Sequence, residues 1–424
     1  MTIAERSLEG IDVLDPAFYR DPWPAYAWLR RNAPLYRDAG SGVWVASRHQ
    51  DVTYVSTHPE LFCSSKGIRP GQSFHFSLIG LDGEDHSRQR RLINRGFSPR
   101  MIKDMEPRVR AVVTEVLDRV APQGECDFVA DIAVPIPIVV IAELMGLPPE
   151  DRERFWHWSD RMMAGDGRSD PGDPVLQDAA AAFAEYVTYV TAIVEDRRAR
   201  YLEAKASERK GRTPPPLGSD LISTLVAASE EGVLTRSEEL THDELTMFLV
   251  ILVVAGNETT RNAIAGAMAA FGRFPDQWHR LVNHPELFAT MPDEVCRYVT
   301  PVLSFLRTAT QDTVLRGQTI RAGEQVLMLY QSANRDEAVF DAPDELRIDR
   351  SPNPHLAFGI GPHVCLGINL ARLEIRVTFE EIVRRFPDMH VAPGFEPRYV
   401  PHTLVHALEA LPVRYSPQRG QRRS

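Results

Sequence analysis

Cys365 lies in a glycine-rich segment directly before an apolar, helix-forming run. The segment AFGIGPHVCLGINLAR, residues 357–372, is followed by apolar residues spaced three or four apart, which predicts a helix. A thiolate is the reactive, metal-binding form of cysteine, and a helix N-terminus lowers the pKa of a thiol because it favours negative charge. Glycines allow the backbone to approach the sulfur. A single thiolate held in this way suits an axial ligand to haem iron, but for a lone cysteine the commoner alternative is a buried, inert thiol.

The other cysteines, Cys63, Cys126 and Cys296, are widely separated and form no CxxC pair. This spacing is typical neither of a zinc site nor of a disulfide framework, and it suits a reducing cytosol. We expect these three thiols to be structural.

Glu258 and Thr259 are neighbours within LVVAGNETTR, residues 252–261, in an otherwise apolar helical run. A buried acid on an apolar face is either paired or functional. A hydroxyl that bonds back to a carbonyl four residues earlier loosens a helix locally, and Gly256 makes this easier. The alternative is an ordinary Thr-Thr pair beside a glutamate that reaches solvent.

The elements that position these residues are mainly helical. Thr241 and Glu244 have the form of a capping box, and they open a run of about thirty residues with helical character. Alternating β-type residues over 307–332 predict strands. We expect a charged surface loop over 203–220 and a closing hairpin over 398–415. The predicted fold class is mainly α with a small β component.

Composition and charge exclude several classes of protein. The chain has 424 residues, 43% of them hydrophobic, and a formal net charge of −10, which argues against a nucleic-acid partner. The apolar stretch 132–148 contains prolines and Glu143, so we expect a buried element and not a membrane anchor. We predict a single domain over 1–415, a basic, disordered tail over 416–424, and a cytoplasmic location.

The segment around Cys365 closely resembles the haem-ligating signature of cytochromes P450, and Leu370-Ala371-Arg372 resembles its bacterial soluble class. The residues that carry the resemblance are Phe358, Gly359, Gly361, His363, Cys365 and Gly367. The resemblance implies the cytochrome P450 fold, with haem b (iron-protoporphyrin IX) between a long central helix and the cysteine loop. Further matching motifs extend it over residues 80–375.

Glu294 and Arg297 match the ExxR pair of the same family. The resemblance implies that the two form a buried lock, completed by Arg350, which supports the haem side and takes no part in turnover. Taken alone, such a pair is usually a surface ion pair worth a few tenths of a kcal/mol.

Cationic side chains also match the family's haem-binding positions. The resemblance implies that His86, Arg90, Arg307 and His363 hold the two propionates, and that Ala255, Phe358, Gly359 and Gly367 also contact the haem. On a helix, His86 and Arg90 share one face, so both can reach one carboxylate.

The family's reaction is monooxygenation: one oxygen atom of O2 enters an apolar small molecule and the other leaves as water. The resemblance implies an oxygen-binding groove in which Thr259 hydrogen-bonds the oxygen and Glu258 relays protons. Electrons would come from a separate ferredoxin and an NAD(P)H-dependent ferredoxin reductase. A basic cluster would provide the docking surface: Arg88, Arg90, Arg91, Arg95, Arg100 and Lys103. The alternative is a haem-thiolate sensor or ligand-binding protein without turnover.

Apolar residues near these motifs predict a hydrophobic substrate pocket, and they are Phe74, Phe76, Ile79, Val254, Val302 and Phe305. Several stretches also resemble actinobacterial enzymes that hydroxylate sterols and branched lipids. We therefore expect a steroid, branched lipid or terpenoid substrate.

Overall fold

The computed structural model describes residues 11–70, 77–165, 170–230 and 240–418. The chain divides into two compact units. Unit 1 comprises Met1–His75, Val113–Val134 and Thr259–Ser424, and unit 2 comprises Phe76–Val112 and Pro135–Glu258. Helices α4 and α9 belong to both, because the divisions fall inside them. A single domain over 1–415 stays a prediction.

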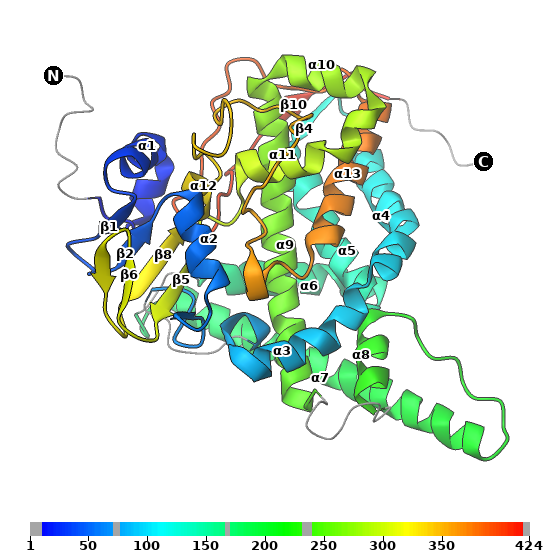
Figure 1. Ribbon diagram of the computed structural model, residues 1–424. Coiled ribbons are helices and arrows are strands. Elements are labelled where there is room, and N and C mark those ends of the chain that lie inside the picture. The colour runs from blue at the N-terminus through cyan, green and yellow to red at the C-terminus, as the bar shows by residue number, and fades with distance from the viewer. Residues whose placement is uncertain (1–10, 71–76, 166–169, 231–239, 419–424) are drawn as a thin grey trace. The chain divides into compact units, whose positions relative to one another are not determined.

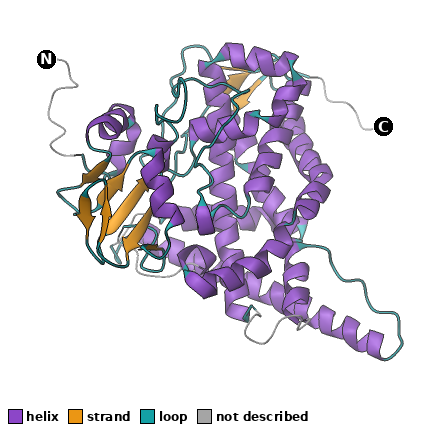
Figure 2. Ribbon diagram, viewed as in Figure 1, coloured by secondary structure: helices purple, strands orange, loops and turns teal. Residues whose placement is uncertain are grey.

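Helices dominate the described chain, which confirms the predicted fold class (Figure 2). The helices are α1 Trp23–Asn32, α2 His49–Thr57, α3 Gly83–Ile93, α4 Pro99–Val120, α5 Pro135–Met145, α6 Arg152–Ala164, α7 Pro174–Arg209, α8 Leu221–Glu230, α9 His242–Arg273, α10 Pro275–Asn283, α11 Met291–Val299, α12 Tyr330–Ala333 and α13 Ile368–Arg385. The strands are β1 Leu35–Arg37, β2 Trp44–Ala46, β3 Phe62–Cys63, β4 Glu125–Asp127, β5 Ser304–Ala309, β6 Thr313–Leu315, β7 Gln318–Ile320, β8 Gln325–Leu329, β9 His390–Val391 and β10 Pro412–Arg414.

A five-stranded sheet in unit 1 has the order β1-β2-β8-β5-β3, with β2 and β8 parallel and the other pairs antiparallel. Side chains alternate between its faces, as the period of two requires. Phe305 and Met328 point to the face that α2 covers, where Ile360 also packs. Leu306 and Leu327 point to the opposite face, which α1 covers (Figure 1). The sheet thereby supports the segment that leads to Cys365.

Helix α9 begins with the predicted capping box. The backbone N–H of Thr241 donates to Glu244, and the backbone N–H of Glu244 donates to the Thr241 hydroxyl, at 2.9 and 3.1 Å. The helix is continuous through Gly256 and Thr259. The local loosening expected from the sequence therefore does not interrupt the helix. A Cβ on Gly256 would lie 2.7 Å from Cδ1 of Ile141 in α5, so this glycine lets the two helices pack closely.

The apolar stretch 132–148 is a buried element, as predicted. It forms the end of a π-helical turn, Phe128–Ala133, and then α5, most of whose residues are buried. Together, Phe128–Met145 is long and apolar enough to cross a membrane, and 61% of it is buried inside the protein.

Two expectations about loops and termini were wrong in their bounds, and a third was confirmed only in part. Helix α7 continues to Arg209, so the predicted loop over 203–220 begins later, because its charged residues are good helix formers. The predicted hairpin is present only over 398–409, where Tyr399 and Leu408 form an antiparallel bridge and the backbone N–H of Val400 donates to Ala407, whereas β10 pairs with β4 and β9. The predicted tail also starts too early: Ser416 bonds Asp388, and the backbone N–H of Gln418 donates to Ala121. Residues 419–424 lie outside the described chain.

Candidate functional site

Cys365 lies in a tight loop just before α13, whose N-cap is Gly367. The backbone N–H of Cys365 donates to the carbonyl of Phe358 at 2.8 Å. Gly359 and Gly361 have left-handed φ values of 67° and 77°. A Cβ on Gly361 would lie 2.6 Å from the carbonyl oxygen of Ser56 in α2. These two glycines are therefore required by the backbone path that presents the thiol.

The reason for a glycine at position 367 differs from the reason at positions 359 and 361. Its φ is −85°, and a Cβ there would meet no atom of the described chain within 4 Å. The protein's own packing therefore does not require glycine at this position. The surrounding residues 357–368 are half-buried, except for exposed Pro362. A partly accessible thiol beside open space at Gly367 fits the close approach of a flat prosthetic group, so these residues are suited to haem.

His363 and Arg307 both belong to unit 1. Arg307 is buried in β5 on the sheet face where Ile360 of the cysteine loop packs. The Nε2 atom of His363 lies 3.2 Å from the hydroxyl of Ser64, which is fully buried. Sequence analysis missed Ser64, because it is 299 positions from its partner and belongs to no motif.

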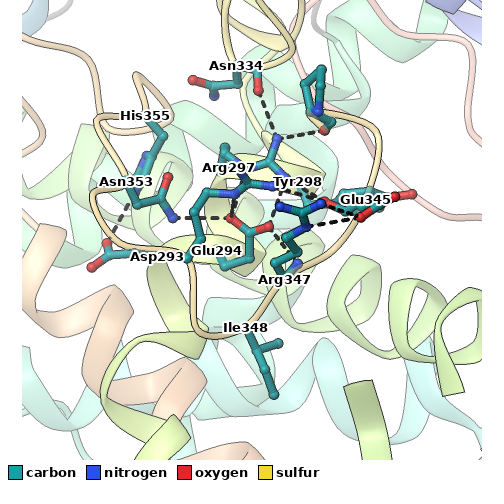
Figure 3. Close-up of polar contacts among 12 residues, drawn as sticks. Asp293, Glu294, Arg297, Tyr298, Asn334, Glu345, Arg347, Ile348, Asn353 and His355 are labelled. Atoms are coloured by element: carbon teal, nitrogen blue, oxygen red, sulfur yellow. Dashed lines mark hydrogen bonds and ion pairs between the residues drawn. The ribbon is translucent and has the colours of Figure 1, made fainter. Parts of the chain in front are cut away.

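The predicted lock of Glu294, Arg297 and Arg350 is present and buried. Arg297 donates to both carboxylate oxygens of Glu294 at 2.8 Å, and Arg350 Nε donates at 3.0 Å. The same carboxylate accepts the backbone N–H of Arg347 and the side-chain amide of Asn353, two partners that the motif did not indicate (Figure 3). The remaining donors of Arg297 bond the backbone carbonyls of Asn334, Pro343 and Glu345. A buried ion pair is stable only when it is satisfied in this way.

The central part of α9 exposes a stripe of small and apolar residues. Ala255 is exposed, and Ile251, Val254 and Thr259 are half-buried, although the neighbouring positions are mostly buried. Glu258 is 4% exposed, so the predicted buried acid is confirmed and its alternative, a glutamate reaching solvent, is wrong.

His86 and Arg90 lie one turn apart on α3 in unit 2, with His86 buried and Arg90 half-buried.

The predicted docking cluster needs one correction, because Arg88 does not belong to it. Its guanidinium pairs with Glu244 of the capping box, which also accepts a hydrogen bond from Gln89 at 2.9 Å. Burial would raise the pKa of Glu244, but the bonds from Arg88, Thr241 and Gln89 hold it below its ordinary value. Arg88 therefore stabilises the start of α9 and is not part of an exposed basic surface.

The predicted pocket residues fall into three groups. Val302 and Phe305 are half-buried in unit 1, and Ile79 and Val254 are half-buried in unit 2. Phe74 and Phe76 lie outside the described residues.

The remaining cysteines have the surroundings expected of structural thiols. Burial raises the pKa of Cys296 well above its ordinary value and that of Cys126 to about 12. Cys63 is buried in β3.

Comparison with known proteins gives a consistent result. The cytochrome P450 family model matches residues 277–413. The chain is 35% identical over 409 residues to a steroid C26-monooxygenase of Mycolicibacterium smegmatis, covering 96% of each chain. It is 36% identical over 419 residues to a methyl-branched lipid omega-hydroxylase of Mycobacterium bovis, covering 92% of this chain and 90% of the relative.

Solved structures agree with these relatives. Cytochrome P450 CYP109E1 of Bacillus megaterium, in complex with testosterone, has a TM-score of 0.81 and 33% identity, covering 93% of this chain and 99% of its own. CYP109B1 of Bacillus subtilis has a TM-score of 0.80 and 32% identity, with the same coverage. Identity of this extent over nearly the whole length of both chains shows that the protein belongs to the cytochrome P450 family, as a haem-dependent monooxygenase.

Proposed function

We propose that this monooxygenase hydroxylates a steroid or a methyl-branched lipid. The observation that carries the proposal is an accessible apolar surface within unit 1, because Val302 and Phe305 retain exposure although the positions beside them are buried. Such a surface suits a ligand without charge near its reacting carbon. The relatives named as steroid and methyl-branched lipid enzymes support the same substrate class.

Cys365 is the proposed thiolate ligand of the haem, and the propionates are held by His86, Arg90, Arg307 and His363. When bound, the haem supplies oxygen activation, which its thiolate ligand promotes. Phe358, Gly359 and Gly367 lie in the loop that carries the thiol, and Gly367 leaves room beside it. Arginine and histidine donors suit carboxylate groups because their hydrogen bonds are charge-assisted.

Glu258 and Thr259 are the proposed proton-handling pair. The carboxyl of Glu258 is buried, and the neighbouring hydroxyl of Thr259 is half-exposed on the accessible stripe of α9. A carboxyl that is shielded from bulk water can hold a proton and deliver it beside a hydroxyl that a ligand can reach, which is general acid catalysis. A sensor without turnover would not need this pair.

Electrons reach the proposed site from a ferredoxin and its NAD(P)H-dependent reductase, in the cytoplasm. Arg91, Arg95, Arg100 and Lys103 are exposed on α3, α4 and the turn between them, so they form a basic surface after Arg88 is removed from the cluster. Clustered positive charge on an otherwise acidic protein steers an acidic partner.

The test is a spectral titration of the haem protein with a steroid, a methyl-branched fatty acid and a terpenoid, followed by product analysis. We expect the steroid or the branched acid to shift the Soret band and yield a hydroxylated product. Val302→Trp should abolish the shift by filling the pocket, whereas Val314→Trp, at a 61% exposed position, should not. Binding and turnover of the terpenoid alone would contradict the proposal.

A further inference from the structure

Phe358 is held from two sides within unit 1. The guanidinium carbon of Arg372 lies 5.6 Å from the centre of its ring. The ring of His355 lies against it at 5.6 Å between centroids, with an angle of 50° between the planes. The carbonyl of Phe358 accepts the backbone N–H of Cys365. A displacement of Phe358 would therefore displace the backbone of the cysteine.

One carboxylate oxygen holds both side chains that contact this ring. Oδ1 of Asp293 accepts Arg372 Nε at 2.8 Å and lies 3.1 Å from Nε2 of His355 (Figure 3 shows Asp293 and His355). The backbone N–H of Ala357 donates to Nδ1 of His355, which leaves the ring proton on Nε2 to donate to Asp293. Asp293 lies on α11 and Arg372 on α13, so two helices fix the ring.

The charges of this cluster lie beside Phe358 of the cysteine loop. Burial would raise the pKa of Asp293, but the hydrogen bond from His355 and the charge of Arg372 hold it below its ordinary value. Buried Cys296, on the same helix as Asp293, is within electrostatic reach of Asp293, Arg372 and Cys365. The Arg372 side chain is 39% exposed, so it can be replaced without opening the core.

We propose that Asp293, His355 and Arg372 form a clamp on Phe358 that positions the Cys365 loop and sets how strongly the thiolate donates electrons to iron. The clamp rests on the proposed ligation by Cys365. Arg372 is a positioning residue, because it acts through Phe358. Groups around a ligand tune the metal by orienting the ligand and by the charge they place near it.

Two substitutions separate geometry from charge. Arg372→Lys keeps the charge but loses the planar, forked guanidinium that can both stack on the ring and bond Asp293. Arg372→Gln loses both and leaves Asp293 without its cation. The matched control is Arg376→Gln, one turn further along α13, where Arg376 pairs with Glu380 at 2.9 Å.

The measurements are amide hydrogen exchange of segment 356–367 and the one-electron reduction potential of the haem protein. Both Arg372 variants should speed exchange in this segment by about fivefold or more. Arg372→Gln should favour ferric iron by about tenfold, a shift of about 59 mV to more negative potential, because positive charge is lost near the thiolate. Arg372→Lys should shift the potential less, and Arg376→Gln should change neither quantity.

Exchange and potential that match the wild type in both Arg372 variants would overturn the clamp. Equal potential shifts in Arg372→Gln and Arg376→Gln would overturn it as well, because general charge would then be the cause. Failure of the proposed ligation has a separate signature. The reduced, CO-bound wild type would then lack the red-shifted Soret band typical of a thiolate ligand.

Discussion

The hydroxyl of Thr259 and the carboxyl of Glu258 are sequence neighbours in very different surroundings. Thr259 is half-buried on the accessible stripe of α9, whereas Glu258 is buried. The hydroxyl is therefore the member of the pair that a small ligand can reach, and the acid is shielded from bulk water.

Replacing Thr259 by Ala should uncouple oxygen consumption from product formation. We expect product per NAD(P)H to fall by about tenfold or more and hydrogen peroxide to rise, because protons would no longer be delivered at the right atom. Both quantities are measured in the reconstituted system. Thr260→Ala is the control, since Thr260 is a buried neighbour on another side of the helix. Unchanged coupling in Thr259→Ala would remove this residue from the mechanism.

Residues within one contiguous motif could be predicted from the sequence. The spacing of Phe358, Cys365 and Gly367 indicated a tight loop directly before a helix, and ExxR indicated the lock. Ser64 and Asp293 could not be predicted, because their partners lie far away in sequence: Ser64 pairs with His363 across 299 positions, and Asp293 pairs with Arg372 across 79. Tertiary packing alone brings such pairs together.

At the scale of elements, the cysteine loop, residues 357–367, is constrained by its contact with the end of α2. Gly361 and Gly394 have nearly the same left-handed φ, 77° and 76°. A Cβ would collide with the backbone of Ser56 at Gly361, but it would meet nothing in the described chain within 4 Å at Gly394. Substitutions at Gly361 and Gly394 therefore distinguish the cost of a left-handed backbone from the cost of a steric collision.

We expect Gly394→Ala to cost about 1–2 kcal/mol of unfolding free energy, the price of left-handed φ alone. Gly361→Ala should cost about 1–3 kcal/mol more because a backbone carbonyl cannot move aside easily, and it should bind less haem. Urea unfolding and the haem-to-protein ratio measure both effects. Equal destabilisation by the two variants would show that α2 does not constrain the loop.

Element types were predictable where local signals were strong. Helix α9 was indicated by its capping box and apolar run, and the strands within 307–332 by alternation, although β5 begins three residues earlier, at Ser304. The end of α7 could not be predicted, because its charged residues are compatible with both a helix and a surface loop. The pairing of β10 could not be predicted either, because the partners of a strand depend on tertiary contacts in the sheet.

At the scale of the whole molecule, net charge and local charge have opposite signs. The protein carries −10 overall, whereas Arg91, Arg95, Arg100 and Lys103 are exposed close together in sequence. The double variant Arg100→Glu/Lys103→Glu should slow reduction by ferredoxin by about tenfold at low salt, with less effect at high salt. Stopped-flow reduction measures this rate. Arg212→Glu is the control at another exposed position, and an equal slowing there would contradict docking at the cluster.

Stability should fall in mild acid because of His406. This side chain is buried, donates through Nδ1 to the carbonyl of Val299 at 3.1 Å and stacks on Tyr399. Burial lowers its pKa from 6.5 to about 4. The unfolded chain therefore takes up a proton at higher pH than the native one, so stability is retained above pH 6.5 and lost as pH falls towards 4.

The expected loss is about 2 kcal/mol at pH 5 relative to pH 7.5, from the linkage of proton uptake to unfolding. Glu374 acts in the opposite sense, because burial raises its pKa well above the ordinary value and stability is lost as pH rises. Both wild type and His406→Gln carry Glu374, so the difference between their urea midpoints isolates His406. That difference should shrink at pH 5, whereas His279→Gln, at an exposed position, should follow the wild type throughout.

The lock around Glu294 also bears on the order in which parts of the chain are synthesised and fold. Its partners extend no further than Asn353, 59 positions along the chain, so its closure is local and entropically inexpensive. Synthesis on the ribosome produces all of these residues before it produces Cys365. The nascent chain can therefore complete the lock before Cys365 emerges. The residues of the lock therefore precede Cys365 in synthesis, whereas α13, β9 and β10 follow it.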